Sequence, residues 1–444
     1  MSLPLSRRAA LGGAAALSAA APFALSTPPA AAAPLTTGRP SAESRAATKF
    51  VQRVVDAYRT SGFRLAQSYQ DDSGLTDIAF TYDNALAIIA LLAAGDKARA
   101  RAIGDALLYA MAHDETFTDH RLRQAYHADT FVNPNGTAHF GWQFGLTGTA
   151  VGDMSWAGIA LAQLAWATAR PEYLKGAVRI GTWIQTNTHS TTGLKGYTFG
   201  ETAGLEGHKS TEHNIDVFAF FTLLRRLTGR AVWATRAAHA WDFVERVWNA
   251  DDGFFWTGSD DGATINKAAG QLPLDVQTWS WLAARKSGYA KALDWARTNL
   301  ATTDTPLRAN SALTGNLSIT GVAFASGSLL ADPTQNIGGQ SWNPKPDVAA
   351  VWLEGTSQLA LALLNRGADD DRARAGDLLT QLANAQVKLG KGQKFGGTVN
   401  PGGLVAATSP LDTGFGFGYF PNLHTGATSW YLMALLKTNP YRFV

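Results

Sequence analysis

Two kinds of helical segment alternate along the chain, and they differ in where their apolar residues fall. In one kind, apolar residues line a single face, which is typical of a helix half exposed to water. In the other kind nearly every position is apolar, which is typical of a helix buried inside a large protein. The amphipathic segments are 41–61, 96–112, 173–186, 231–248, 289–300 and 369–386, and the apolar segments that follow them are 85–94, 157–167, 215–224, 275–284, 347–365 and 425–436.

Together these segments form six repeats of one amphipathic and one apolar helix, at a spacing of about 50 to 75 residues. Six such pairs close into a barrel whose inner ring consists of the apolar helices. An irregular α-superhelix is the alternative, but the strict alternation and the number of repeats favour closure. We therefore predict an all-α protein in which residues 41–444 form one (α/α)6 barrel, with long loops and small β-hairpins at one face.

Polar residues gather where the apolar helices begin. A long loop leads from each amphipathic helix to the next apolar one, so in a barrel all six starts lie at the same end. Loops on a rigid scaffold commonly carry binding and catalytic groups, and we expect a functional site at this end. The polar residues at these starts are Asp83, Asn84, Asp153, Glu212, His213, Asp216, Asp275, Gln277, Glu354 and His424.

With these starts and six repeats, the chain resembles the six-hairpin glycosidase superfamily, which comprises secreted carbohydrate-active enzymes on an (α/α)6 barrel with an acidic cleft. The resemblance covers nearly all of the chain beyond the leader, but it is architectural. It matches no motif of one particular family, so no catalytic residue and no substrate is transferred from it. It implies a reaction that cleaves a glycan with two carboxylates at the inner-helix N-terminal face.

Glu212 is the leading candidate for a catalytic acid. Glycoside hydrolysis needs a protonated carboxyl for the leaving oxygen and an ionised carboxylate as base or nucleophile. Asp216 lies four residues on, hence on the same helical face, and a neighbouring carboxylate raises the pKa of an acid. Thr211 is expected to cap this helix. A structural interpretation is equally open, in which Glu212 complements the helix dipole or pairs with Lys209.

The second carboxylate is expected among the other inner-helix starts. Asp153 and Glu354 are the leading choices, and Glu354 is expected inside its helix, where an unpaired charge is costly. Asp83 and Asp275 are as compatible with helix capping as with substrate binding. Aromatic faces stack on sugar rings, although tryptophans are more often core residues. The candidates for substrate binding are Tyr82, Asp83, Asn84, Trp156, His213, Asp275, Trp279, Trp352, Tyr419 and His424.

The composition narrows the classes of function. Of the 444 residues 46% are apolar, enough for a substantial core, and the formal net charge of +3 lacks the basic excess of nucleic-acid-binding proteins. The absence of cysteine excludes disulfides and thiolate metal sites. No metal-binding or cofactor motif occurs, so we expect no metal and no cofactor. The acids and tryptophans at the inner-helix starts predict a carbohydrate substrate. Nothing in the sequence predicts a partner protein.

The first residues predict an export signal. The stretch around Arg7 and Arg8 resembles a twin-arginine motif, and an apolar stretch and a run of small residues follow it. We expect residues 1–33 to be cleaved off, residues 34–40 to act as a linker, and the mature protein to be secreted and to have no membrane segment. An uncleaved membrane anchor is the alternative, but prolines interrupt the short apolar stretch.

Other classes of function stay open. Polysaccharide lyases and enzymes of uronic-acid sugars also use helical toroids, but they need a Tyr or His base and cations that meet the substrate carboxylate. A non-catalytic glycan-binding protein needs the tryptophans but no pair of carboxylates. A terpene-cyclase-type barrel is remote, because no Asp-x-Asp-Asp-type motif occurs. Glu212 and a second acid facing one cleft favour the hydrolase.

Overall fold

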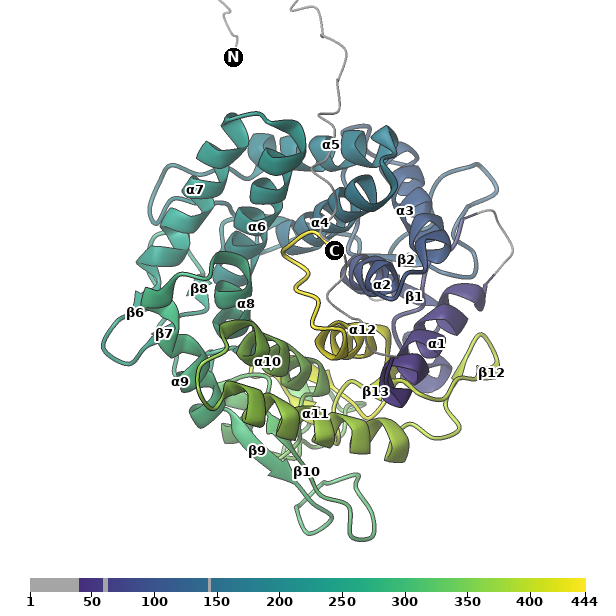
Figure 1. The fold of residues 1–444 in the computed structure, drawn as a ribbon, viewed down its shortest axis with the longest axis vertical. Helices are drawn as coiled ribbons and strands as arrows, with labels where there is room; N and C mark the ends of the chain where they lie inside the picture. The colour runs from purple at the N-terminus through teal and green to yellow at the C-terminus, as the bar shows by residue number, and fades with distance from the viewer. Residues whose placement is uncertain (1–39, 59–62, 143–144) are drawn as a thin grey trace, which may run out of the picture.

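The computed structural model describes residues 40–58, 63–142 and 145–444, so the predicted signal and nearly all of the predicted linker lie outside the described residues. In this part of the chain, twelve α-helices form two concentric rings (Figure 1). The inner ring consists of α2 (Thr81–Ala93), α4 (Val151–Thr168), α6 (Thr211–Thr228), α8 (Leu274–Ala284), α10 (Leu353–Arg366) and α12 (Thr425–Leu435). The outer ring consists of α1 (Ala42–Asp56), α3 (Lys97–Ala112), α5 (Pro171–Asn187), α7 (Val232–Arg246), α9 (Lys291–Asn299) and α11 (Asp371–Lys388).

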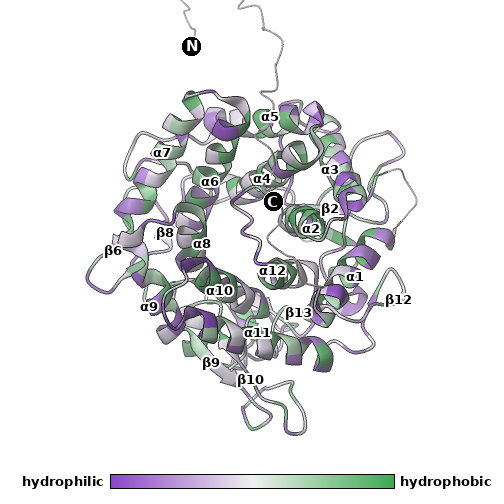
Figure 2. Cartoon of the chain, viewed as in Figure 1, coloured by the Kyte–Doolittle hydropathy of each residue, from purple (hydrophilic) through white to green (hydrophobic). Residues whose placement is uncertain are grey.

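The inner ring closes on itself. Each inner helix contacts the next one along the chain, and α12 contacts α2. Each outer helix packs against the inner helix that precedes it, with α1 against α12. The inner helices are mostly apolar, whereas polar residues are concentrated on the outer ones (Figure 2). The predicted (α/α)6 barrel is therefore confirmed, and the closing contact excludes an open superhelix.

Two predicted helix bounds were wrong. The first amphipathic helix ends at Asp56, not at residue 61. The fifth inner helix begins at Leu353, not at residue 347, because residue 352 is extended and its N–H donates to the carbonyl of Val322 at 2.8 Å. Glu354 consequently lies in the first turn of α10 rather than inside the helix.

The predicted cap of α6 was also displaced by one residue. Ser210 is the N-cap, and its hydroxyl accepts the N–H of His213 at 3.3 Å. Thr211 is the first helical residue, and its hydroxyl donates to the carbonyl of Trp256 in the following loop at 2.7 Å. Thr211 thus joins α6 to the loop that precedes α8 instead of capping α6.

Short antiparallel strand pairs occupy the loops that lead from outer to inner helices. The pairs are β1 (Ile78–Phe80) with β2 (Ala125–His127), β3 (Thr149–Ala150) with β4 (Gly200–Glu201), β5 (Lys209–Ser210) with β8 (Gly258–Ser259), β6 (Trp248–Asn249) with β7 (Phe254–Phe255), β9 (Ala301–Asp304) with β10 (Ile319–Val322), β11 (Lys394–Phe395) with β12 (Thr398–Val399), β13 (Leu404–Val405) with β16 (Leu423–His424), and β14 (Leu411–Asp412) with β15 (Gly418–Tyr419). Single 3₁₀ turns lie at Asp71–Ser73, Ser287–Tyr289, Ser326–Leu330 and Ile337–Gly339.

A repeated backbone hydrogen bond joins each inner helix to the following loop. The first N–H of every inner helix donates to a carbonyl of the loop that precedes the next inner helix, at 2.8 to 3.1 Å. The bond satisfies an N–H group that has no partner within its own helix. The accepting carbonyls belong, from α2 to α12, to Gln124, Phe199, Thr257, Phe324, Ala406 and Ser68.

A second repeated contact joins each inner helix to the loop before it. The side chain of the fourth helical residue accepts a backbone N–H from that loop, and these residues are Asn84, Met154, Asn214, Gln277, Thr356 and Thr428. The loops are thereby attached to the helix starts all around the ring. Side chains at the second and third helical positions are consequently held in place at one end of the barrel.

Candidate active site

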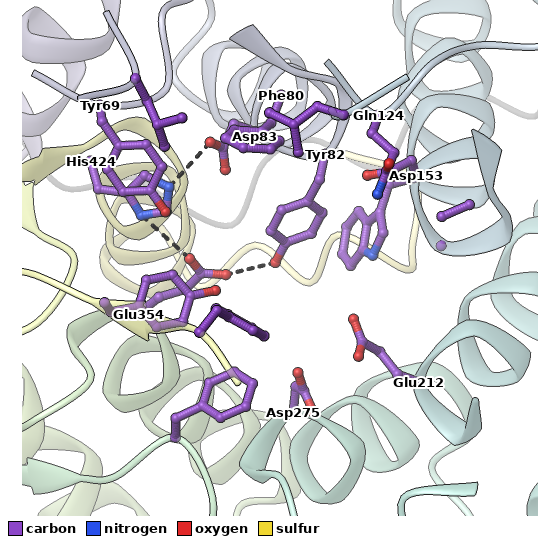
Figure 3. A pocket seen from close by; sticks show the side chains of 18 of the residues that line it. Tyr69, Phe80, Tyr82, Asp83, Gln124, Asp153, Glu212, Asp275, Glu354 and His424 are labelled. Atoms are coloured by element: carbon purple, nitrogen blue, oxygen red, sulfur yellow. Dashed lines mark hydrogen bonds and ion pairs between the residues drawn. The ribbon is translucent and has the colours of Figure 1, made fainter. Parts of the chain in front are cut away.

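A cavity of about 640 Å³ lies at the loop end of the inner ring. Five inner helices each contribute one carboxyl to it from the second or third helical position, and His424 caps the sixth, α12 (Figure 3). These carboxyls belong to Asp83, Asp153, Glu212, Asp275 and Glu354. The positive end of each helix dipole favours an acid in its first turn, and the ring turns all five toward one space.

No lysine or arginine occurs among the described residues that line this cavity. Carboxyls crowded in a low-dielectric space without cations hold protons that they would release in water. Burial, and then the charge of Asp83, raise the pKa of Asp153 to about 8. Burial also raises the pKa of Asp275 and that of Glu354 to about 7 each. The cavity therefore carries protonated and ionised carboxyls side by side near neutral pH.

Glu212 also holds its proton beyond the pH at which a glutamate usually releases it. Burial is the main cause of a pKa well above the ordinary value, and repulsion by Asp275, Asp216 and Asp153 adds to it. The alternative pairing with Lys209 does not occur, because the ammonium group donates to the carbonyl of Thr192 at 2.8 Å. A protonated carboxyl in a cavity is suited to donate a proton to a leaving group.

Glu354 has hydrogen-bond donors that stabilise its anion. The hydroxyl of Tyr82 donates to Oε1 at 2.7 Å, and the indole N–H of Trp430 donates to that hydroxyl at 2.8 Å. The other oxygen, Oε2, has no hydrogen-bond partner among the described residues and lies 3.7 Å from Nδ1 of His424. Figure 3 shows Tyr82 reaching between the carboxyls to meet Glu354.

His424 lies between two carboxyls. Its Nδ1 accepts the backbone N–H of Ala427 at 3.2 Å, which leaves the ring proton on Nε2, and Nε2 donates to Oδ2 of Asp83 at 3.1 Å. Burial opposes a charge on the ring, but attraction and hydrogen bonding to Asp83, together with the charge of Glu354, outweigh it and raise the pKa. The phenol ring of Tyr69 stacks on the imidazole, with centroids 4.3 Å apart.

Aromatic rings form much of the remaining wall. Trp156 lies 5.4 Å from Tyr82 and 5.2 Å from Trp279 between ring centroids. Such flat apolar faces beside polar groups suit a sugar, which has both kinds of surface. The aromatic residues that line the cavity are Tyr69, Phe80, Tyr82, Trp142, Trp156, Phe199, Trp279, Phe324, Trp352, Phe417, Tyr419 and Phe420.

Most residues predicted for the site line this one cavity. They are Tyr82, Asp83, Asp153, Trp156, Glu212, His213, Asp275, Trp279, Trp352, Glu354, Tyr419 and His424. The capping alternative fails for Asp83, Asp153 and Asp275, because the N-caps of their helices are Phe80, Ala150 and Pro273.

Two predicted residues lie outside the cavity. Asn84 is 1% exposed, and its amide bonds the backbone of Ala66 and Phe80. Asp216 is fully buried one turn deeper in α6 and accepts the hydroxyl of Tyr441 at 2.8 Å. Both residues therefore support the site from behind rather than lining it.

Sequence reasoning missed the loop residues of the wall, such as Gln124, Phe199 and Phe324. Their carbonyls accept the first N–H of an inner helix, so they occupy equivalent places in the repeats. Their distance from the following inner helix varies widely, however, because the loops differ in length. No constant spacing in the sequence marks them.

No protein-family model matches the sequence, and no curated protein matches it. Solved structures do match the fold. A cellobiose 2-epimerase from Bacillus thermoamylovorans is 11% identical with a TM-score of 0.57, over 88% of this chain and 98% of that one. An α-amylase from Clostridium perfringens is 11% identical with a TM-score of 0.56, over 91% and 99%.

An α-1,6-mannanase of Salegentibacter, in complex with α-1,6-mannotriose, is 12% identical with a TM-score of 0.51 over 90% of this chain and 100% of that one. That protein is an inactive variant with two consecutive aspartates replaced by asparagine. At such identities the likeness shows the fold alone, which is an (α/α)6 barrel.

Within the described ranges, no cluster of three or more His, Cys, Asp or Glu side chains is arranged to hold a metal ion. In the same part of the chain, the helices are all too short or too polar to cross a membrane.

Proposed function

We propose that this protein is a secreted glycoside hydrolase that cleaves a neutral poly- or oligosaccharide in the cavity of the inner ring. The observation that carries the proposal is the convergence of five helix-start carboxyls on one cavity with aromatic walls. Hydrolysis of a glycosidic bond requires two of them in different protonation states. The proposal is also supported by solved structures of the same fold, which include a mannanase and an amylase.

Glu212 acts in this proposal as the general acid, and Glu354 as the ionised partner. Glu212 holds its proton because of burial and of the neighbouring carboxyls, and it passes that proton to the leaving glycosidic oxygen. Glu354 accepts the phenol hydrogen bond of Tyr82, and its second oxygen has no hydrogen-bond partner in the described part of the chain. That oxygen either activates a water molecule or attacks the sugar carbon. Burial raises the pKa of both Asp153 and Glu354, but His424 and the hydrogen bond from Tyr82 oppose the rise at Glu354, whereas the charge of Asp83 adds to it at Asp153. This difference favours Glu354 as the ionised partner.

The carboxyl pair proposed here differs from a pair of consecutive aspartates. Replacing two consecutive aspartates inactivates the mannanase of the same fold. The consecutive aspartates of this chain, at 71–72, 251–252, 260–261 and 369–371, do not line the cavity. We therefore assign the chemistry to single carboxyls on separate helices.

The lack of lysine and arginine in the described lining supports a neutral substrate. A uronic acid would bring its own negative charge into a space already crowded with carboxyls, and like charges repel strongly where water is scarce. This argument disfavours a polysaccharide lyase as well, since a lyase needs a cation beside the substrate carboxylate.

The test measures reducing-sugar release from neutral and uronic polysaccharides, with absorbance of unsaturated products read in parallel. Glu212→Gln and Glu354→Gln are expected to lower kcat on a neutral glycan by about 10²-fold or more. The matched control is Glu206→Gln, which alters an exposed loop glutamate and is expected to keep full activity. Unsaturated products would instead indicate a lyase, and binding without cleavage by the wild type would indicate a glycan-binding protein.

A second candidate is epimerisation of a free sugar. The observation that favours it is His424, whose ring lies between Asp83 and Glu354 and can accept a proton near neutral pH. A cellobiose 2-epimerase has the same fold. Chromatography of disaccharides distinguishes the two candidates, because an epimerase changes the sugar without splitting it and loses this activity in His424→Asn.

Secretion is part of the proposal and rests on the twin arginines. Replacing Arg7 and Arg8 by lysine is expected to retain the protein inside the producing cells, whereas the unchanged chain reaches the medium. Immunoblots of cell and medium fractions measure this directly. Equal export of both chains would remove the twin-arginine assignment.

A further inference from the structure

The end of the chain returns into the barrel from the side opposite the loops. Helix α12 begins at the loop end, so residues after it emerge at the other end, and residues 439–444 then run across the inside of the ring (Figure 1). A buried glutamine of α4, Gln163, holds this segment at three points, one of which is the carbonyl of Arg442, to which its amide N–H donates. Its amide N–H donates to the carbonyl of Pro440 at 3.0 Å, and its carbonyl accepts the N–H of Val444 at 3.0 Å.

Within this segment, Tyr441 packs against two tryptophans of the cavity wall. The side chain is 2% exposed, and its ring centroid lies 5.1 Å from that of Trp156 and 6.3 Å from that of Trp279. Both tryptophans also line the cavity. The hydroxyl of Tyr441 donates to Oδ1 of Asp216 at 2.8 Å. The last segment thus reaches the carboxyl cluster from behind.

Asp216 and Glu212 share one face of α6, because they are four residues apart. Asp216 is fully buried and lies outside the cavity, whereas Glu212 lines it. Any charge on Asp216 therefore acts on Glu212 across a dry interior, where electrostatic interactions are strong. The ionisable groups that face this pair from other elements are Asp153 of α4, Asp275 of α8, Glu354 of α10 and Tyr441 itself.

We infer that Tyr441 is a positioning residue for the proposed acid Glu212, because its hydroxyl holds the Asp216 carboxyl one helical turn behind that side chain. The inference rests on the proposed hydrolase. A buried carboxylate ionises only as far as donors stabilise its anion, and Tyr441 supplies such a donor. Burial raises the pKa of Asp216 well above its usual value, and the hydrogen bond from Tyr441 opposes this shift. Where Asp216 ionises, its charge keeps the proton on Glu212.

Tyr441→Phe tests this role by removing one oxygen and leaving the ring. Asp216 becomes harder to ionise, so Glu212 loses part of the repulsion that retains its proton. The pKa of Glu212 is expected to fall by about one unit. Carboxyl ¹³C NMR of protein labelled in glutamate measures it, with the Glu212 resonance assigned by its loss in Glu212→Gln. The alkaline limb of the pH profile of kcat/KM is expected to move down by the same amount.

Two further variants separate this role from a merely structural one. Tyr431→Phe is the matched control, because Tyr431 is fully buried and its hydroxyl has no hydrogen-bond partner in the described part of the chain; it is expected to leave the Glu212 titration unchanged. Asp216→Asn removes the charge itself and is expected to lower the pKa of Glu212 as Tyr441→Phe does. The double variant is expected to show no further shift, because both changes act through one carboxyl.

The NMR titration does not depend on activity, so the two proposals fail separately. An unchanged Glu212 titration in folded Tyr441→Phe and in Asp216→Asn overturns the positioning role, whatever the hydrolysis assay shows. The expected shift in a protein that cleaves no glycan overturns the hydrolase proposal and leaves the carboxyl coupling in place. A lower melting temperature with unchanged titration and pH profile assigns Tyr441 to structure alone.

Discussion

Asn84→Ala distinguishes a structural clamp from a sugar-binding side chain. Asn84 accepts the N–H of Ala66 at 2.8 Å and donates to the carbonyls of Ala66 and Phe80 at 3.0 and 2.9 Å. Alanine leaves the N–H and C=O of Ala66 without these partners in the interior, at about 1–3 kcal/mol for each group. We therefore expect a loss of about 2–6 kcal/mol in the free energy of unfolding.

The change in melting temperature follows from the size of the barrel. An unfolding entropy of about 2.1 cal/mol/K per residue over about 400 residues converts 3 kcal/mol into roughly 4 °C. Differential scanning calorimetry measures this shift. Asn187→Ala is the matched control, because Asn187 is exposed and makes one local bond, to the carbonyl of Trp183 at 2.9 Å. It is expected to change the melting temperature by less than about 1 °C.

Activity provides the second readout for Asn84→Ala. If Asn84 is a clamp, kcat/KM of the folded variant on the cleaved glycan stays within about threefold of the wild type, because the residue lies outside the cavity. An unchanged melting temperature together with a collapse of kcat/KM would refute the clamp and return Asn84 to substrate binding.

Four other substitutions have defined outcomes. Because burial raises the pKa of Asp153 from 3.8 to about 8, the folded state holds a proton that the unfolded state releases; stability therefore falls as pH rises from about 4 to about 8. Asp153→Asn is expected to flatten this decline in calorimetric scans from pH 5 to 8, and an equally steep decline contradicts the shift. Gly158→Ala places a methyl group 2.2 Å from the Phe220 ring and is expected to cost about 1–3 kcal/mol in urea denaturation. Gly376→Ala, with nothing within 4 Å, is expected to stabilise its helix by about 0.5–1 kcal/mol; equal effects of the two would contradict the packing. Tyr82→Phe deprives the proposed anionic partner of its phenol donor, so the acid limb of kcat/KM is expected to move up by about one pH unit, and an unmoved limb speaks against that assignment.

The sequence was enough to assign each helix to the inner or the outer ring, because the spacing of apolar residues along a helix reflects how much of its surface is buried. A helix that is apolar on every side is stable only where other helices surround it, and the inner ring is that place. Ser155 and Gln163 of α4 show that single buried polar residues do not disturb this pattern. The closure of the ring then followed from the number of alternating pairs.

The place of the acids followed from the same reasoning. Asp153, Glu212 and Glu354 stand at the starts of apolar helices, and in a closed ring those starts share one end. Glu354 was nevertheless expected inside its helix rather than in the first turn, because the apolar run begins before the helix does. The backbone hydrogen bond from residue 352 to Val322 of the preceding loop makes α10 begin later than the apolar run. The local sequence gives no sign of this contact.

Asp83 and Asn84 show where periodicity stops being informative. They are consecutive polar residues, but successive side chains on a helix point about 100° apart, so one lines the cavity and the other bonds the loop backbone. The neighbouring helices decide which face of α2 points into the cavity. Asp216 shares a face with Glu212, yet Tyr441 from the far end of the chain covers it.

Local patterns of apolar and polar residues were thus enough for the helices, the two rings, the closed barrel and the end at which the acids meet. Packing between segments distant in the sequence decided which acids line the cavity, which loop aromatics form its wall, and which carboxyls remain protonated. The physical reason is that periodicity reports only whether a residue is buried, whereas the depth, the partners and the charge of a buried group depend on atoms that other segments bring to it.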